Sequence, residues 1–444
     1  MKVLATKEIK HLLVNDSPQQ KVVSNVVYKL NEATASDFLK KFVGTIIEGT
    51  SINIIRFECN SRADISEGDL IQLHVGDHLV LYQIIQGRTT VEMLESKNEA
   101  GFIVGEAIQI GVWNNKERTF NKFGWVPEMN TPVFLASDIE SINIAKGEYI
   151  IGHLPKTKYP VIINMNDAVT HHLAILGITG SGKSVFARNL INQIRSTGTK
   201  FICVDFTNEY KTKFPDVSSI IAEADAQKMF KAIDRLSQEL SEFKNKQKPE
   251  VINQCEGILK DKFTSAIKSF IQSDKEIVLF ELPDVSNTTG ILEYTKWFFK
   301  VLFEIARTEN NYGKSLCIVL EEAHTVIPEW NFIGTLDKDA GALVNCIGQI
   351  ALQGRKYNIG FIVIAQRTAN VSKTILTQCN SVVAFRQVDK TGADFLSNYI
   401  GTDMVKALPN LQPRQAIVVG KGFRSGIPMI VQIPEIDESV TPNN

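Results

Sequence analysis

The sequence predicts an α/β protein with a mostly parallel sheet, preceded by a small β-barrel and carrying a helical insertion. Two observations lead to this fold class. From about residue 171 onward, continuous apolar runs alternate with helical patterns, as in an open sheet whose strands are covered on both faces. In the first 150 residues, short alternating segments are separated by Gly, Asn or Asp, which indicates a small antiparallel barrel or sandwich.

Composition is that of an ordinary globular protein. Of the 444 residues, 44% are hydrophobic and 22% are charged, and the formal net charge is −1. Any contact with nucleic acid must therefore come from local basic patches. The six cysteines are scattered, no signal peptide is evident, and no apolar run reaches the roughly 18 residues that span a bilayer. We expect a cytoplasmic protein with no membrane partner.

We expect three regions along the chain. The first, 1–150, is the barrel-like domain with a short leading helix at 35–42; a connector at 141–160 follows it. The second, 151–430, is the α/β domain, in which 222–272 forms a helical insertion. The third, 431–444, is a polar tail or an arm on a neighbour. The expected core strands are 172–177, 200–205, 276–282, 315–321, 360–365 and 381–385; the expected helices include 184–194, 291–306 and 339–352.

The stretch "GITGSGKS" at 177–184 fits the G-x-x-x-x-G-K-[ST] pattern of a phosphate-binding loop. It follows a predicted strand and opens a predicted helix, the context in which backbone N–H groups and the helix dipole hold phosphate. Lys183 would reach the β- and γ-phosphates, and Ser184 would place its hydroxyl on Mg²⁺. The nucleotide-binding residues expected here are Gly177, Thr179, Gly180, Ser181, Gly182, Lys183, Ser184 and Val185, and the expected ligands are ATP and Mg²⁺.

The segment "SLCIVLEEAH" at 315–324 is an apolar strand that ends in two carboxylates. Such a strand is typical of the Walker B element. Glu321 would hold the Mg²⁺ shell, and Glu322 would polarise the attacking water. His324 either orients the loop that carries Glu322 or takes part directly.

Polar residues also follow two other predicted strands. Gln366 ends "GFIVIAQ" and could sense the γ-phosphate or position water; alternatively it is a simple strand terminus. Asp205 ends "FICVD" and could support the water or the metal shell. Glu209 and Tyr210 follow it and could lie over the nucleotide or form a polar loop.

Two arginines could act on a neighbouring subunit. Arg355, in "LQGRKYNIG", either complements the dipole at a helix C-terminus or reaches into a neighbour's site as an arginine finger. The pattern leaves both readings open. Arg386, in "VVAFRQ", is a second candidate finger with less context.

Taken in order, "IGHL", "HHLAILGITGSGKS", "DFTNEY", "LEEAH", "GRKYNIGFIVIAQR" and "LTQCNSVVAFR" resemble the HerA family of hexameric ATPases, relatives of FtsK-type DNA translocases and conjugation motors. The resemblance covers most of the chain. It implies a RecA-like core behind a small β-barrel, a homohexameric ring, translocation of double-stranded DNA, and a partner effector such as a nuclease or a sirtuin-like NADase. The settings implied are DNA-end processing or anti-phage defence.

The resemblance also assigns residues. Lys183 and Ser184 match the phosphate loop, Glu322 the catalytic glutamate, Gln366 the sensor, and Arg355 the arginine that serves the neighbouring site. A different class of function remains open at this point: a hexameric ATP-binding scaffold that regulates a partner without moving DNA.

Overall fold

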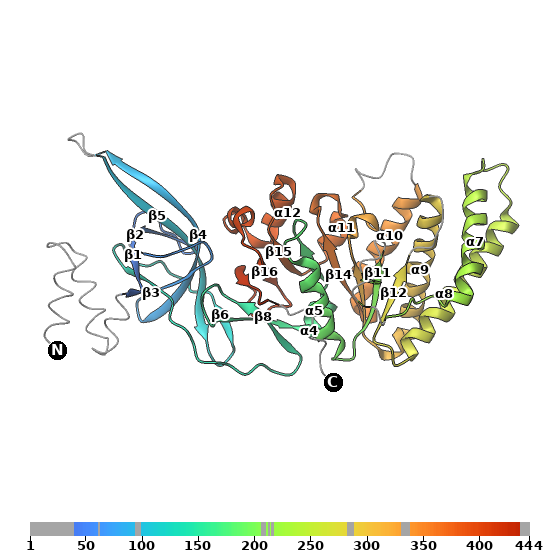
Figure 1. The fold of residues 1–444 in the computed structure, drawn as a ribbon, viewed down its shortest axis with the longest axis horizontal. Coiled ribbons are helices and arrows are strands. Elements are labelled where there is room, and N and C mark those ends of the chain that lie inside the picture. Colours follow the sequence, from blue (N-terminus) through green and yellow to red (C-terminus); the bar gives the residue numbers. More distant parts are fainter. Residues whose placement is uncertain are drawn as a thin grey trace.

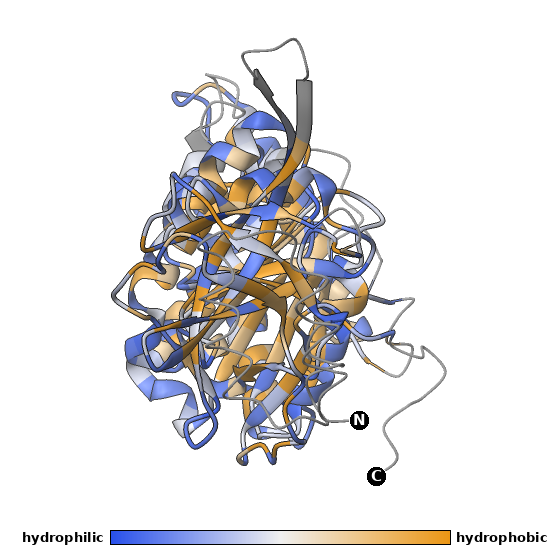
Figure 2. Ribbon diagram, turned by 90° about the vertical axis from the view of Figure 1, so that its left-hand side faces the viewer, coloured by the Kyte–Doolittle hydropathy of each residue, from blue (hydrophilic) through white to orange (hydrophobic). Residues whose placement is uncertain are grey.

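The computed structural model describes residues 40–60, 63–93, 99–205, 210–211, 214, 217–281, 288–329 and 338–435. These residues form two sheets, a barrel at the left of Figure 1 and a large α/β core that extends to the right. Apolar residues concentrate on the strands inside, and hydrophilic residues on the outer loops and helix faces (Figure 2). Within the described part of the chain, no helix has the length and apolarity to cross a membrane.

The N-terminal sheet closes on itself. Its order is β2-β1-β7-β3-β4-β5-β6, and an additional pairing between β2 and β5 completes a barrel of six strands, with β6 appended to β5. The small apolar core inside includes Phe57, Tyr82 and Val133. The strands are β1 Phe42–Ile46, β2 Ile54–Cys59, β3 Leu70–Val75, β4 His78–Met93, β5 Glu99–Asn114, β6 Thr119–Asn121 and β7 Pro132–Leu135.

The core contains a ten-stranded sheet in the order β12-β11-β13-β14-β10-β15-β16-β17-β8-β9. The first six strands in this order are parallel, and the remaining pairs are antiparallel. The strands are β8 Glu148–His153, β9 Pro160–Asn164, β10 Leu173–Leu176, β11 Lys200–Asp205, β12 Ile277–Glu281, β13 Leu316–Leu320, β14 Ile359–Ala365, β15 Ser381–Phe385, β16 Gln415–Gly420 and β17 Met429–Gln432.

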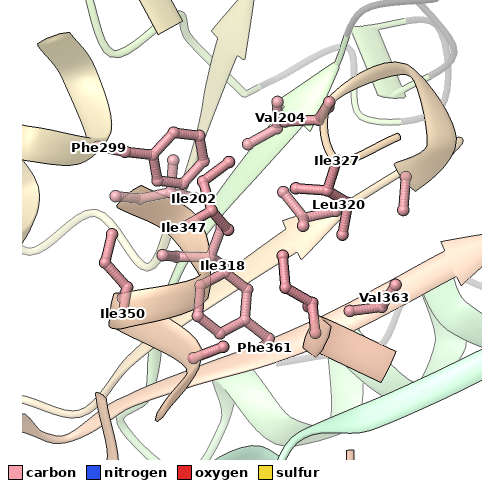
Figure 3. Packing of buried hydrophobic residues seen from close by; sticks show 14 of the residues in the cluster. Ile202, Val204, Phe299, Ile318, Leu320, Ile327, Ile347, Ile350, Phe361 and Val363 are labelled. Atoms are coloured by element: carbon pink, nitrogen blue, oxygen red, sulfur yellow. The ribbon is translucent and has the colours of Figure 1, made fainter. Parts of the chain in front are cut away.

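Helices cover both faces of this sheet, which explains why its parallel strands are apolar throughout. In Figure 3, Phe299 and Ile347 from two helices pack onto Ile318 and Phe361 of neighbouring strands. The main helices are α4 Met165–Thr170, α5 Lys183–Arg195, α7 Glu223–Ser241, α8 Pro249–Gln272, α9 Thr288–Glu309, α10 Lys338–Gln353, α11 Lys373–Leu376 and α12 Lys390–Ile400. Short 3-10 turns are Asn310–Gly313, Ala323–Thr325, Gly354–Tyr357, Thr368–Asn370 and Met404–Asn410.

The helices α7 and α8 lie between β11 and β12 in the chain, at the end of the molecule farthest from the barrel (Figure 1). They are not a separate unit. Phe263 of α8 contacts Phe280 of β12 and Tyr294 of α9 edge-on, and these residues share one core cluster with the central sheet. The hairpin therefore extends the core of the α/β domain.

Polar contacts join the barrel to the core. The fully buried Gln83 of β4 donates to the carbonyls of Gly68 and Ile430 and accepts from the amide of Ile430, so it pairs with β17 like a strand residue. Nearby, Glu148 of β8 forms ion pairs with Arg118 at 2.9 Å and with Arg424. Because Gln83 and Glu148 are buried and paired, these contacts fix the relative position of the two parts.

The structure differs from the expected organisation at three places. The range 141–160, expected as a connector, contains β8, which begins at Glu148 and belongs to the core sheet. A connector was predicted because this segment is short and is followed by Pro and Lys. Of the leading helix at 35–42, residues 35–39 lie outside the described part, and Phe42 already begins β1. The expected tail at 431–444 overlaps β17, and 436–444 lie outside the described residues.

Candidate nucleotide-binding site

The loop 177–182 links the end of β10 to the start of α5. Gly177 has φ +149°, and a side chain there would lie 2.6 Å from Cβ of Phe385, so only glycine fits beside β15. Gly182 precedes the helix with φ +104°. The amide of Ile178 donates to the carbonyl of Arg386 at 3.0 Å, which anchors the loop to the next strand.

The side chains of this loop converge on the helix N-terminus. Thr179 and Gly180 are exposed at the tip, and Ser181, Gly182, Ser184 and Val185 are half-buried. The ammonium group of Lys183 is bonded to the carbonyl of Ile178 at 2.8 Å. Burial lowers the pKa of Lys183, and the charges of Glu322 and Glu321 oppose that shift. The lysine therefore lies within electrostatic reach of both carboxylates.

Ser184 and Glu321 bring two hard oxygen donors together. The hydroxyl of Ser184 lies 3.4 Å from Oε1 of Glu321, which directly follows β13 and is nearly fully buried. Mg²⁺ prefers oxygen ligands and commonly binds through one or two protein groups plus water and phosphate. These two residues fit a magnesium ion at this position. Among the described residues, no cluster of three or more His, Cys, Asp or Glu forms a separate metal site.

Glu322 has a strained backbone. Its φ and ψ are 45° and 51°, the left-handed region that a glutamate rarely adopts. The side chain is 12% exposed, and Oε2 lies 3.3 Å from Nδ1 of His324. Strain of this kind is concentrated at functional sites, because the surrounding structure must hold the residue there.

Gln366 meets the phosphate loop directly. It follows β14, the strand that lies between β10 and β13, and the hydroxyl of Thr179 donates to its Oε1 at 2.5 Å. The carboxyl ends of β10, β13 and β14 thus bring Lys183, Glu321 and Gln366 to one edge of the sheet, where ligands bind in open α/β folds.

Asp205 and Tyr210 lie below the surface of the site. Asp205 is 1% exposed, and its Oδ2 accepts from the amide of Lys211 at 3.0 Å. Tyr210 is buried and stacks on Phe214, and burial together with the charge of Glu321 raises its pKa. Tyr210 supports the floor beneath Glu321 and does not lie over the nucleotide crevice. Glu209 lies outside the described residues.

Arg355 lies at the opposite edge of the sheet. It is exposed, in the turn Gly354–Tyr357 that precedes β14, whereas Gln366 follows β14. At about 3.3 Å per residue, the seven residues of β14 separate the two ends by roughly 20 Å. With the residues that the structure describes, the guanidinium forms no recorded ion pair or hydrogen bond. An arginine placed there does not reach the phosphate loop of its own subunit.

Arg386 is placed differently. It follows β15 at the same edge as the phosphate loop, and its Nε donates to the carbonyl of Pro409 at 2.8 Å. Its own carbonyl accepts from Ile178. The residue therefore fixes the loop through its backbone, while its side chain is held against the turn Met404–Asn410.

Sequence reasoning passed over two buried polar residues near Arg355. His172, at the start of β10, and Asn311, in the turn after α9, are 4% and 0% exposed, and both bond to the backbone around the Arg355 turn. A His pair and an Asn pair beside a strand are too common in sequences to have marked either residue.

A phosphate loop, a strand ending in adjacent glutamates and a polar residue on the strand between them define a P-loop ATPase. Comparison with known proteins shows which ATPases the chain is similar to. Residues 149–227 match the sequence profile described as the central domain of helicase HerA. The chain is 25% identical to the DNA double-strand break repair helicase HerA of Sulfurisphaera tokodaii, over 70% of this chain and 74% of that protein.

A second relative, the protein of the same name from Saccharolobus solfataricus, is 23% identical over 69% of this chain and 73% of its own length. The chain is thus a distant relative of the HerA helicases, which confirms the resemblance of the motifs. Among solved structures, VirB4 of Thermoanaerobacter pseudethanolicus aligns with a TM-score of 0.42 and 14% identity, covering 68% of this chain and 99% of VirB4. The conjugation coupling protein TcpA of pCW3 aligns with a TM-score of 0.39 and 14% identity, covering 88% of each chain.

Proposed function

We propose that this chain forms a homohexameric ring that hydrolyses ATP to move double-stranded DNA, with each nucleotide held between two subunits. The observation that carries the proposal is the position of Arg355. It lies roughly 20 Å along β14 from Gln366, is exposed, and forms no ion pair or side-chain hydrogen bond with the described residues of its own chain. In a head-to-tail ring, one face of each subunit meets the opposite face of the next, so such an arginine can complete a neighbour's site.

The surface around Arg355 supports contact with another copy. Leu352, in the last turn of α10, is 51% exposed, and Tyr312, in the turn next to Asn311, is 41% exposed. Asn311 bonds to Tyr357, so both apolar side chains lie near the Arg355 turn. Exposed apolar groups beside an arginine with no recorded partner are typical of a subunit interface.

The residues of the site divide the chemistry among them. Lys183 and the amides of the loop bind and orient the phosphates, and Glu322 accepts a proton from the attacking water. Gln366 holds that water or the γ-phosphate, while Asp205, the last residue of β11, holds the segment that follows this strand through the amide of Lys211. Arg355 of the next subunit adds positive charge where negative charge develops. A magnesium ion held by Ser184 and Glu321 would supply charge neutralisation at the β- and γ-oxygens.

We propose DNA as the molecule that the ring moves because the relatives are named as DNA double-strand break repair helicases. The net charge of −1 requires that DNA contacts be local. We further propose that the ring delivers DNA to an effector enzyme, a nuclease or a sirtuin-like NADase, in DNA-end processing or anti-phage defence.

A subunit-mixing experiment tests the composite site. Arg355→Ala and Glu322→Gln each inactivate every site when present alone. In rings mixed from both variants, some interfaces pair an intact Glu322 with an intact Arg355. We expect the ATPase activity of the mixture to exceed that of either variant alone. If mixing restores nothing while mass measurement shows mixed rings, Arg355 does not act in trans.

The DNA step has its own test. ATP turnover is measured with and without double-stranded DNA over a series of salt concentrations, because phosphate contacts weaken steeply with salt. We expect stimulation by DNA at low salt that fades at high salt, and loss of movement along DNA in Lys183→Ala. Full activation of the effector by Lys183→Ala and Glu322→Ala rings without DNA would instead support a regulatory scaffold.

A further inference from the structure

Two side chains from other elements, those of His172 and Asn311, bond to the backbone on either side of Arg355. On one side, Nε2 of His172 lies 2.8 Å from the carbonyl of Ala351. That carbonyl is among the last four of α10, which lack a donor within the helix. The other ring nitrogen, Nδ1, accepts from the amide of Phe361 at 3.1 Å. His172 therefore ties the end of α10 to β14.

On the other side of Arg355, Nδ2 of Asn311 donates to the carbonyl of Tyr357 at 2.7 Å. The ring of Tyr357 also packs edge-on against Phe303 of α9 at 5.8 Å. The backbone is therefore fixed four residues before Arg355 and two residues after it. The arginine side chain itself stays exposed between these two fixed points.

Asn311 reaches this position only through an unusual backbone. Asn310, Asn311 and Tyr312 have φ values of 46°, 48° and 53°, and Gly313 follows with 74°. Four consecutive left-handed residues are disfavoured, above all for the tyrosine. A strained segment persists only when its surroundings impose it, and such segments cluster where function needs a fixed geometry. Nothing in the nucleotide site of the same subunit uses this strain, because the segment lies at the amino-terminal edge of β13.

We propose that Asn311 and His172 are positioning residues that hold Arg355 in place for the neighbouring subunit. The inference rests on the proposed function, in which Arg355 acts in trans. When an arginine that inserts into another subunit is misplaced, the rate of ATP hydrolysis falls steeply. A rigid base lets the interface form with the guanidinium already oriented. The two residues act through Arg355 and do not touch the nucleotide.

The test uses Asn311→Gly and His172→Asn in the assembled protein. Glycine at position 311 accepts the left-handed backbone and removes only the side-chain bond to Tyr357. Asparagine at position 172 tolerates the φ of +59° but is too short to reach Ala351. We expect kcat for ATP to fall roughly tenfold to a hundredfold in each variant while ATP affinity stays the same. The matched control is Thr295→Val, which also removes a buried hydrogen bond to a carbonyl, within α9, and should leave kcat unchanged.

A double-mutant cycle gives the decisive readout. In an Arg355→Ala background, Asn311→Gly and His172→Asn should cause no further loss of kcat, because they act only through that arginine. An equal loss in both backgrounds would overturn the proposal. If Arg355→Ala alone has no effect, the composite site itself fails. If Arg355→Ala lowers kcat but Asn311→Gly and His172→Asn do not, only the present inference fails.

Hydrogen exchange of the unmodified protein provides a test that needs no variant. We expect the amides of 354–358 to exchange slowly, as in the core, although Arg355 and Lys356 are exposed. Fast exchange across this turn in the wild type would contradict a rigid base.

Discussion

The hydroxyl of Thr179 lies 2.5 Å from Oε1 of Gln366, so the tip of the phosphate loop is bonded to the end of the adjacent strand β14. This bond joins the element that holds phosphate to the element that begins, at its other end, just after the Arg355 turn. We therefore expect removal of Gln366 to separate ATP binding from turnover.

We predict that Gln366→Ala lowers kcat for ATP by roughly tenfold to a thousandfold and changes ATP affinity little, because in the proposed function the glutamine acts on water or the γ-phosphate. Steady-state kinetics and titration with a fluorescent ATP analogue separate the two quantities. Thr179→Val, which removes the partner hydroxyl while keeping the branched shape, should have a smaller effect on kcat. A large loss of affinity in Gln366→Ala would instead make the residue part of the binding surface.

The pairing of Ser184 with Glu321 predicts a magnesium phenotype. Ser184→Ala removes one of two oxygen donors, so we expect the Mg²⁺ concentration for half-maximal activity to rise by about tenfold or more. Titration of Mg²⁺ at saturating ATP measures this directly. The neighbouring Ser181, whose hydroxyl bonds the carbonyl of Ile178 within the loop, provides the control. Equal Mg²⁺ curves for Ser184→Ala and Ser181→Ala would exclude a specific role for Ser184.

Gly177 and Gly257 predict opposite outcomes for the same substitution. Gly177→Ala places a methyl group 2.6 Å from Cβ of Phe385 on a backbone with φ +149°, and we expect a loss of about 2–4 kcal/mol in the free energy of unfolding. Gly257 is exposed within α8 and its added Cβ meets nothing within 4 Å, so Gly257→Ala should gain about 0.5–1 kcal/mol. Chemical denaturation of both variants checks the pair. A stable Gly177→Ala protein would mean that the loop moves away from β15.

The local patterns were sufficient for the parallel core, but not for the contacts that complete the site. Strands β11 and β15 have the predicted bounds because Lys200–Asp205 and Ser381–Phe385 are apolar runs with sharp ends. Strand β8, which lies between β17 and β9, was predicted as a connector, since its pairing with β17 joins residues almost 280 positions apart. His172 and Asn311 were missed for a similar reason. Their roles come from bonds to Ala351 and Tyr357, which no local pattern encodes.

The buried, hydrogen-bonded ring of His172 also predicts a pH dependence of stability. Burial lowers the pKa of His172 below its ordinary value of about 6.5, with the nearby His171 acting in the same direction and the bond to Ala351 opposing it. Above about pH 6.5 the imidazole is neutral in both the native and the unfolded state, and its contribution to stability is complete. As the pH falls below 6.5, the unfolded chain takes up a proton that the native chain does not.

The free energy of unfolding should therefore fall between pH 6.5 and the lowered native pKa, by about 1.4 kcal/mol for each unit of the shift. Protonation also puts a hydrogen on Nδ1, which then no longer accepts from the amide of Phe361. Denaturation of wild type and His172→Asn at pH 7.5 and 5.5 tests this. The comparison is needed because burial also lowers the pKa of His153, which both proteins retain. We expect a smaller loss of stability in the variant. Equal losses in both proteins would show that the pKa of His172 is the same in the native and unfolded states, so that this histidine does not contribute to the pH dependence of stability.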